Sequence, residues 1–303
     1  MLDLKKVNEA VATERKSVVR TRMVTLAIEI TVIVAIVAMQ IQAQNVQFGS
    51  WFVWVIVIAI VLFVNESIYG GRKRNYVSKV KRIILDTVFM PTFDDVTFSE
   101  HGGISIETLR SRRLVDTADN QYVNDYLCGS HNGIQFTRTD VKTESESTDS
   151  EGHTTTSTVF KGQVYSFDFN KVISEYVRVS DKNFWTALGF FKKNRVKMDD
   201  GEFNELFDVT TSNEHETFYV FTPHFMNRYK ALHQKFDGRA CMVIDGALLY
   251  LAINNKRDSF EPNAFSELDE SFKQSLQQDI DIIKIVIDDL DLTNDLFLPR
   301  SQT

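Results

Sequence analysis

The chain has 303 residues, with 34 Lys and Arg against 41 Asp and Glu, and 2 Cys. Its 13 Gly and 4 Pro are too few for a collagen-like or low-complexity chain, and 2 Cys are too few for a disulfide scaffold. The net charge of −7 argues against a nucleic-acid-binding protein, which usually has a basic surface, so we expect no nucleic acid among the partners.

The N-terminal third contains two long apolar stretches. Residues 1–22 are polar and predict a short cytoplasmic segment, an amphipathic or frayed helix on the membrane surface. Apolar residues then dominate 23–43 and 51–69, and a short uncharged link at 44–50 joins these two stretches. Since about 20 helical residues cross the hydrocarbon of a bilayer, the two stretches predict a transmembrane hairpin. The alternatives are two buried core helices of a soluble domain or a signal peptide, for which no suitable cleavage site is present.

Lys and Arg flank the hairpin on one side only. They occur repeatedly in residues 5–22 and 72–82, whereas the link has none. Because such residues stay in the cytoplasm, we expect a multi-pass protein of the cell membrane with both termini cytoplasmic. Glu29 lies inside the first span, where an ionisable residue suggests a function. The structural alternative, which we favour, is that Glu29 reaches the interface or sits protonated against the neighbouring helix.

After the second span, residues 70–90 predict a basic juxtamembrane helix that ends before Pro91. Its charges set the topology and can also contact anionic lipid head groups, so the bilayer is an expected partner. Residues 91–303 then predict a cytoplasmic α+β domain. Its first part, 92–120, is irregular apart from a short helix at 105–113.

The rest of this domain alternates between strand and helix patterns. The predicted strands, rich in Val, Tyr, Phe and Thr, are 122–129, 134–142, 158–169, 173–179 and 203–210. The predicted helices are 213–222, 223–236 and a long amphipathic helix at 264–290. Asp245-Gly246 predicts a tight hairpin between strands 239–244 and 247–254.

Residues 142–158 contain no apolar side chain and predict a mobile loop, with a phosphorylated or partner-binding segment as the alternative. The predicted sheet is mostly antiparallel. If it curves and the last helix closes it, the domain would resemble a pleckstrin-homology-like module.

No residue pattern points to a catalytic, cofactor-binding or metal site. The two glycine-rich phosphate-binding motifs are absent, and no two His have the spacing of a zinc helix. Cys128 and Cys241 are far apart and are expected to be small core residues in strands. His131 beside Cys128, and His224 at a predicted helix start, are the remaining candidates for chemistry. We therefore expect neither a cofactor nor an enzyme.

Several aromatic motifs resemble those of the DUF3137 family of bacterial membrane proteins, whose function is unknown. The motifs are FKGQ at 160–163 with FDFNK at 167–171, Phe203–Val209, Phe218–Met226, Leu249–Ile253 and Phe260–Pro262. The resemblance covers about residues 100–265. It implies a bacterial inner membrane protein and makes a LemA-type membrane protein a candidate partner. In the FKGQ motif, Gly162 is expected to allow close backbone packing or a bulge.

Three functions remain open at this point. The first is a non-enzymatic binding or scaffold module displayed on the cytoplasmic face of the membrane. The second is an enzyme that acts on a membrane-proximal substrate through His131 or His224 and nearby carboxylates. The third, suggested by Glu29, is a subunit of a transporter or channel, for which two spans would have to form a homo-oligomer.

Overall fold

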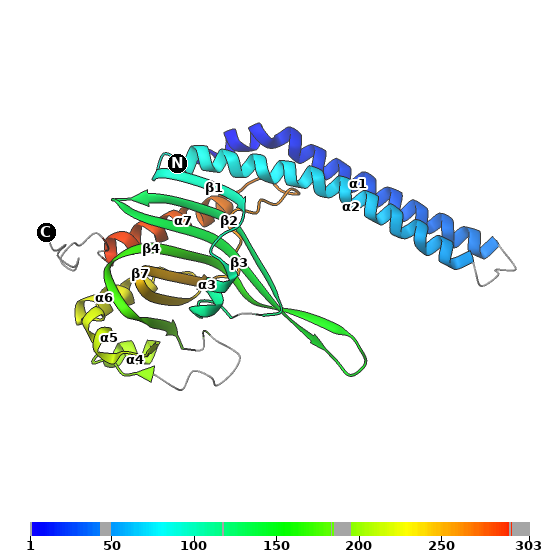
Figure 1. Cartoon of the computed structure of the whole chain (residues 1–303). Helices are drawn as coiled ribbons and strands as arrows, with labels where there is room; N and C mark the ends of the chain where they lie inside the picture. Colours follow the sequence, from blue (N-terminus) through cyan, green and yellow to red (C-terminus); the bar gives the residue numbers. More distant parts are fainter. Residues whose placement is uncertain are drawn as a thin grey trace. The chain divides into compact units, whose positions relative to one another are not determined.

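The computed structural model describes residues 2–42, 50–116, 118–182, 184, 195–290 and 292. The chain forms two compact units (Figure 1). Unit 1 comprises Met1–Val88 and Glu261–Lys273, and unit 2 comprises Phe89–Phe260 and Gln274–Thr303. Most of the predicted link at 44–50, and the end of the chain, lie outside the described residues.

Unit 1 is built on two long helices, α1 (Leu4–Gln42) and α2 (Ser50–Ile84), which pack against each other along their length (Figure 1). A short π-helical turn, Leu85–Phe89, follows α2, so residues 70–89 are helical as predicted, in continuation of the second apolar segment; their place beside a membrane stays a prediction. The separate segment predicted at 1–22 is wrong. Because neither Gly nor Pro interrupts residues 4–42, one helix continues from the polar segment into the apolar one.

Residues 261–273 belong to unit 1 and pack against the polar end of its helices. The side chain of Asn8 holds the backbone of Leu268 at both ends: Nδ2 donates to the carbonyl at 2.9 Å, and Oδ1 accepts from the amide at 2.9 Å. Arg15 pairs with Glu267 at 2.6 Å. The base of the hairpin therefore has three chain segments instead of two.

Unit 2 contains an antiparallel sheet, which confirms the α+β class. Its strands are β1 (Asp94–His101), β2 (Asn120–His131), β3 (Ile134–Thr148), β4 (Thr154–Asp181), β5 (Arg195–Val196), β6 (Phe207–Thr211) and β7 (Arg239–Asn254). The order is β1-β2-β3-β4-β6-β5, and β7 pairs with β4 (Figure 1). The likeness to a pleckstrin-homology module stays a prediction.

A capping side chain marks the start of each short helix of unit 2. They are α3 (Ile106–Ser111), α4 (Gly201–Leu206), α5 (Glu214–Val220), α6 (Pro223–His233) and α7 (Glu270–Asp289), the last of which starts in unit 1. Ser105, Asn213 and Thr222 each accept a hydrogen bond from the amide three residues ahead and so cap α3, α5 and α6. The three short helices predicted around 105–113, 213–222 and 223–236 are confirmed.

Two segments predicted to be irregular are strands. Residues 94–101 form the edge strand β1, whose polar side chains hid the alternation. The predicted loop 142–158 is wrong in extent, because β3 and β4 remain paired as far as Thr148 and Thr154. Backbone hydrogen bonds and paired Thr and Ser residues hold this two-stranded ribbon without an apolar face.

The predicted hairpin at Asp245-Gly246 is also wrong. β7 is continuous, and the segments on both sides of Gly246 pair with the same strand, β4. β4 likewise joins the two strands predicted at 158–169 and 173–179, and its register against β7 shifts between Asp168 and Ile173. Gly246 adopts φ +61°, which lets β7 follow this irregularity.

Two predicted boundaries are wrong because a carboxylate caps a helix. The carboxylate of Asp200 accepts from the amide of Phe203 at 3.0 Å and starts α4, so the strand predicted at 203–210 begins only with β6. The carboxylate of Asp269 accepts from the amide of Phe272 at 3.0 Å. The long last helix therefore starts at Glu270 and not at 264.

Candidate functional site

The two helices of unit 1 have zones of opposite character. In residues 23–39 and 55–68, large apolar side chains point outward; Ile33, Val34 and Phe63 are 48%, 61% and 74% exposed. Toward the start of α1 and the end of α2 the apolar residues are buried, among them Val11, Val18, Tyr76 and Val80. An exposed apolar surface of this kind marks contact with a membrane or with protein.

The polar zone carries its charges outside and pairs some of them across the helices. Lys79 contacts the carboxylate of Glu14 at 2.7 Å, and this hydrogen bond lowers the pKa of Glu14. At about 1.5 Å per residue, the 39 residues of α1 extend over about 58 Å. The hydrocarbon of a bilayer needs only about 30 Å, so the polar zone accounts for the remaining length.

Glu29 lies against the neighbouring helix. Nδ2 of Asn65 on α2 donates to Oε1 of Glu29 at 3.3 Å and to the carbonyl oxygen of Thr25 at 3.3 Å. Asn65 is 5% exposed. The structural alternative placed Glu29 against the second helix, and its position agrees with that interpretation.

Unit 2 contains a buried charge cluster, defined here as Arg138 and Asp140 of β3 with Asp279 of α7. Nη1 and Nη2 of Arg138 donate to the two carboxylate oxygens of Asp140 at 2.5 and 2.9 Å. Nη2 also donates to Asp279 at 2.8 Å. The ring of Phe260 lies 4.4 Å from the guanidinium carbon. Arg138 is 0% exposed, so its charge depends on these partners.

Neutral donors complete the cluster. Nε2 of Gln163 donates to Asp140 at 3.0 Å, and the hydroxyl of Tyr165 donates to Asp279 at 3.2 Å. Both donors come from β4, so the cluster joins two adjacent strands to α7. Arg138 and Asp140 reach it together because residues two apart on a strand share a face.

The cluster carries more negative than positive charge. Burial raises the pKa of Asp140 to about 7, and the carboxylates of Asp258 and Asp279 act in the same direction against Arg138. Burial also raises the pKa of Asp279. A proton shared among these carboxylates therefore balances the charge near neutral pH.

Beside the cluster, single carboxylate oxygens of Asp125, Asp140 and Asp258 lie within 4.8 Å of one another. Hard cations such as Ca²⁺ bind carboxylates but take six to eight oxygen ligands. Of the three, Asp140 is already paired with Arg138. We give the charge cluster of Arg138, Asp140 and Asp279 a structural role.

The residues singled out in the sequence lie on different elements. Sγ of Cys128 is 2.8 Å from Oγ1 of Thr97, whereas Nε2 of His131 is 3.7 Å from Asp288. His224 is exposed in the first turn of α6. Cys241 is buried in β7 as predicted, and burial raises the pKa of its thiol to about 12, which makes it unreactive.

The charge cluster was missed at the sequence level, although one signal was present. Ile134 and Phe136 on β3 are buried, and the same alternation places Arg138 and Asp140 on the buried face. Charged residues at buried positions of a strand need partners from another element. The partner Asp279 is 141 residues away in sequence and cannot be identified from the pattern.

Comparison with known proteins gives a family and a distant structure. The model of the family described as DUF3137, protein of unknown function, matches residues 158–292 and confirms the resemblance. No curated protein sequence matches the chain. The crystal structure of the mycobacterial trehalose monomycolate transport factor A, TtfA, is similar over 74% of this chain and 98% of that one. With a TM-score of 0.36 and 8% identity, this likeness supports no argument about function.

Proposed function

The DUF3137 model matches residues 158–292, and that family brings no known activity, so we propose a function from the hairpin itself. The protein is a non-enzymatic binding or scaffold module of the bacterial inner membrane. Its hairpin crosses the bilayer, both termini face the cytoplasm, and unit 2 is displayed there to bind another membrane protein.

The observation that carries this proposal is the division of the hairpin into two zones. Only 11% and 6% of the residues in the most apolar windows of the two helices are buried, whereas the core helix of a soluble domain would be mostly buried. The apolar zones of both helices lie at the same end of the hairpin. A lipid bilayer would cover such an apolar surface on all sides of the helix pair.

The orientation rests on charge. Lys and Arg are frequent in residues 5–22 of α1 and 72–82 of α2, which form the polar zone. The positive-inside rule places this zone in the cytoplasm. Unit 2 follows α2 directly and is therefore expected on the same side.

A binding role is supported by exposed apolar side chains on unit 2. Leu206 of α4 and Phe218 and Tyr219 of α5 are 44%, 39% and 55% exposed. Aromatic residues are enriched in protein interfaces. The expected partner is another membrane protein, and a LemA-type protein remains the candidate from the family resemblance.

Cysteine labelling tests the topology. In a Cys128→Ser, Cys241→Ala background, single cysteines are placed by Lys5→Cys, Gln47→Cys or Glu151→Cys. A membrane-impermeant maleimide should label only the Gln47→Cys protein in intact spheroplasts and all three after lysis. The cysteine-free background is the control. Labelling of Lys5→Cys or Glu151→Cys from outside would overturn the orientation.

Purification from native membranes in mild detergent tests the binding role. A partner that co-purifies in fixed stoichiometry, and is lost when Phe218 and Tyr219 are both replaced by Ser, supports the scaffold. The same variant must keep the labelling pattern of the parent. A protein that purifies alone and turns over a metabolite would instead favour the enzyme.

A further inference from the structure

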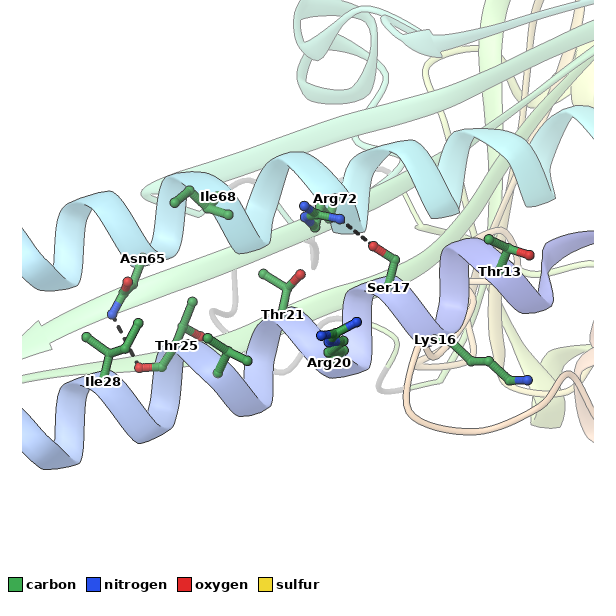
Figure 2. A pocket seen from close by; sticks show the side chains of 11 residues that line it. Thr13, Lys16, Ser17, Arg20, Thr21, Thr25, Ile28, Asn65, Ile68 and Arg72 are labelled. Carbon is green, nitrogen blue, oxygen red and sulfur yellow. Dashed lines mark hydrogen bonds between the residues drawn. The ribbon is translucent and has the colours of Figure 1, made fainter.

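The two helices of unit 1 enclose a groove of about 520 Å³ near the middle of the hairpin (Figure 2). Residues between 13 and 28 of α1 form one wall, and residues between 65 and 72 of α2 form the other. We call it the hairpin groove. It lies wholly within unit 1 and extends from the polar zone into the apolar zone.

The groove is basic at one end and apolar at the other. One end of the groove lies toward the start of α1 and the end of α2. Lys16, Arg20 and Arg72 line this end, together with the hydroxyl groups of Ser17 and Thr21. Figure 2 shows Arg72 reaching across from α2 to Ser17, to which it donates a hydrogen bond. Val24, Ile28 and Ile68 line the opposite end.

The basic end has no internal counter-ion. None of the described residues that line the groove is a carboxylate. Of the acidic residues near the groove, Glu14 pairs with Lys79 at 2.7 Å and Glu66 with Arg22 at 3.3 Å, and Glu29, beside the apolar end, accepts from Asn65 at 3.3 Å. The basic end therefore offers three cations and several hydroxyl donors along its lining, a combination suited to a phosphate group.

We propose that the hairpin groove binds an anionic phospholipid, with the phosphate at Lys16, Arg20 and Arg72 and an acyl chain along the apolar end. The inference rests on the proposed membrane insertion, which sets the direction of the groove. Along α1, Lys16 and Ile28 are separated by about 18 Å, at about 1.5 Å per residue. That distance leads from the head-group level into the hydrocarbon.

The apolar end distinguishes a lipid from free phosphate. A soluble phosphate would use only the basic end and leave Val24, Ile28 and Ile68 uncovered. The volume of about 520 Å³ lies within the range of small-molecule sites and accommodates a head group with the first part of a chain. Basic pockets between transmembrane helices on the cytoplasmic side are a known setting for anionic head groups.

The test uses the full-length protein in nanodiscs that contain equal amounts of phosphatidylglycerol and phosphatidylcholine. Native mass spectrometry measures which lipid remains bound after release. We expect wild type to retain phosphatidylglycerol preferentially. Replacing Lys16, Arg20 and Arg72 together by Gln should reduce this preference about tenfold or more.

A charge-matched control replaces Lys5, Arg74 and Arg82 by Gln. These residues lie on the same helices, are exposed and do not line the groove. The control should keep the wild-type preference. An equal loss in both variants, or no loss in the groove variant, would overturn the proposal. If glycerol phosphate displaces the lipid at equal concentration, the site is one for soluble phosphate, and the lipid proposal is wrong.

Two further measurements keep the outcome clear. Maleimide labelling of each variant reports insertion separately, so a failure of the proposed topology is distinguished from a failure of lipid binding. Photoactivatable phosphatidylglycerol needs no substitution in the groove. In wild type it should cross-link to Val24, Ile28 or Ile68 in preference to Ile33, which is equally exposed but does not line the groove, and an even distribution would contradict a defined site.

Discussion

Replacing Arg138 by Met should destabilise unit 2 strongly. Arg138 is 0% exposed and donates three hydrogen bonds of 2.5–2.9 Å to Asp140 and Asp279. The substitution keeps an apolar side chain of similar length but leaves two buried carboxylates without their cation. Removing one partner of a buried ion pair costs about 3–5 kcal/mol, and we expect a loss in this range.

Hydrogen exchange of β3 and β4 amides in the full-length protein in detergent measures the free energy of opening. The matched control is Arg195→Met, which removes an exposed ion pair with Asp208 at 3.0 Å. Arg195 is 49% exposed, so its loss should cost about 1 kcal/mol or less. Both variants are compared with wild type at pH 8, where Asp140 is ionised.

A second variant separates charge from shape. Combining Arg138→Met with Asp140→Asn and Asp279→Asn removes both buried carboxylates while keeping polar groups of the same size. This triple variant should recover part of the lost stability, because no uncompensated charge remains. If Arg138→Met costs no more than Arg195→Met, Arg138 does not balance ionised carboxylates, and the account of the cluster given above is refuted.

Three further predictions concern single positions. Burial raises the pKa of Asp140 from 3.8 to about 7, so between these values the folded state binds a proton that the unfolded state has released. The opening free energy of wild type should therefore fall by up to about 4 kcal/mol between pH 4 and 7. In Asp140→Asn it should fall by clearly less. A Cβ at Gly162 would overlap a carbonyl oxygen of β7, so Gly162→Ala should lower the melting temperature. At Gly201 a Cβ meets no atom within 4 Å, so Gly201→Ala should leave the melting temperature unchanged. Equal melting temperatures for the two variants would contradict the close approach at Gly162. Asp269→Ala removes the bond to the amide of Phe272, so exchange should accelerate in the first turn of α7 and stay unchanged in its last turn.

The sequence is most informative where one physical effect dominates. The apolar stretches at 23–43 and 51–69 exceed what a soluble core helix needs, and residues 23–42 and 51–69 lie within the two long helices. The helix starts near 105 and 223 are also decided locally, since Ser105 and Thr222 each cap a helix with a single side chain. Gly162 was expected to allow close backbone packing, and its Cα lies against the carbonyl of Ile253.

The failures arise where distant pairing decides the outcome. Asp245-Gly246 has the composition of a tight turn, but β4 provides one continuous partner for both flanking segments, and the backbone extends through the pair. The ribbon around Thr148 and Thr154 lacks apolar residues, so only its backbone pairing reveals it. The charge cluster depends on Asp279, which no local pattern connects to Arg138.

The positions of the cluster and the groove are two further reasons for the function proposed above. A titrating group such as Asp140 would be a natural candidate for acid–base chemistry, yet Asp140 and Asp279 are only 4% and 2% exposed, and both accept hydrogen bonds from the buried Arg138. A substrate cannot reach a carboxylate in that position without opening the sheet, so the shifted pKa reports the cost of burial. The hairpin groove, by contrast, lies between two helices that are long and apolar enough to cross a membrane, and none of the described residues that line it is a carboxylate. Recognition of a charged ligand at the membrane surface is therefore the chemistry that we propose for this groove.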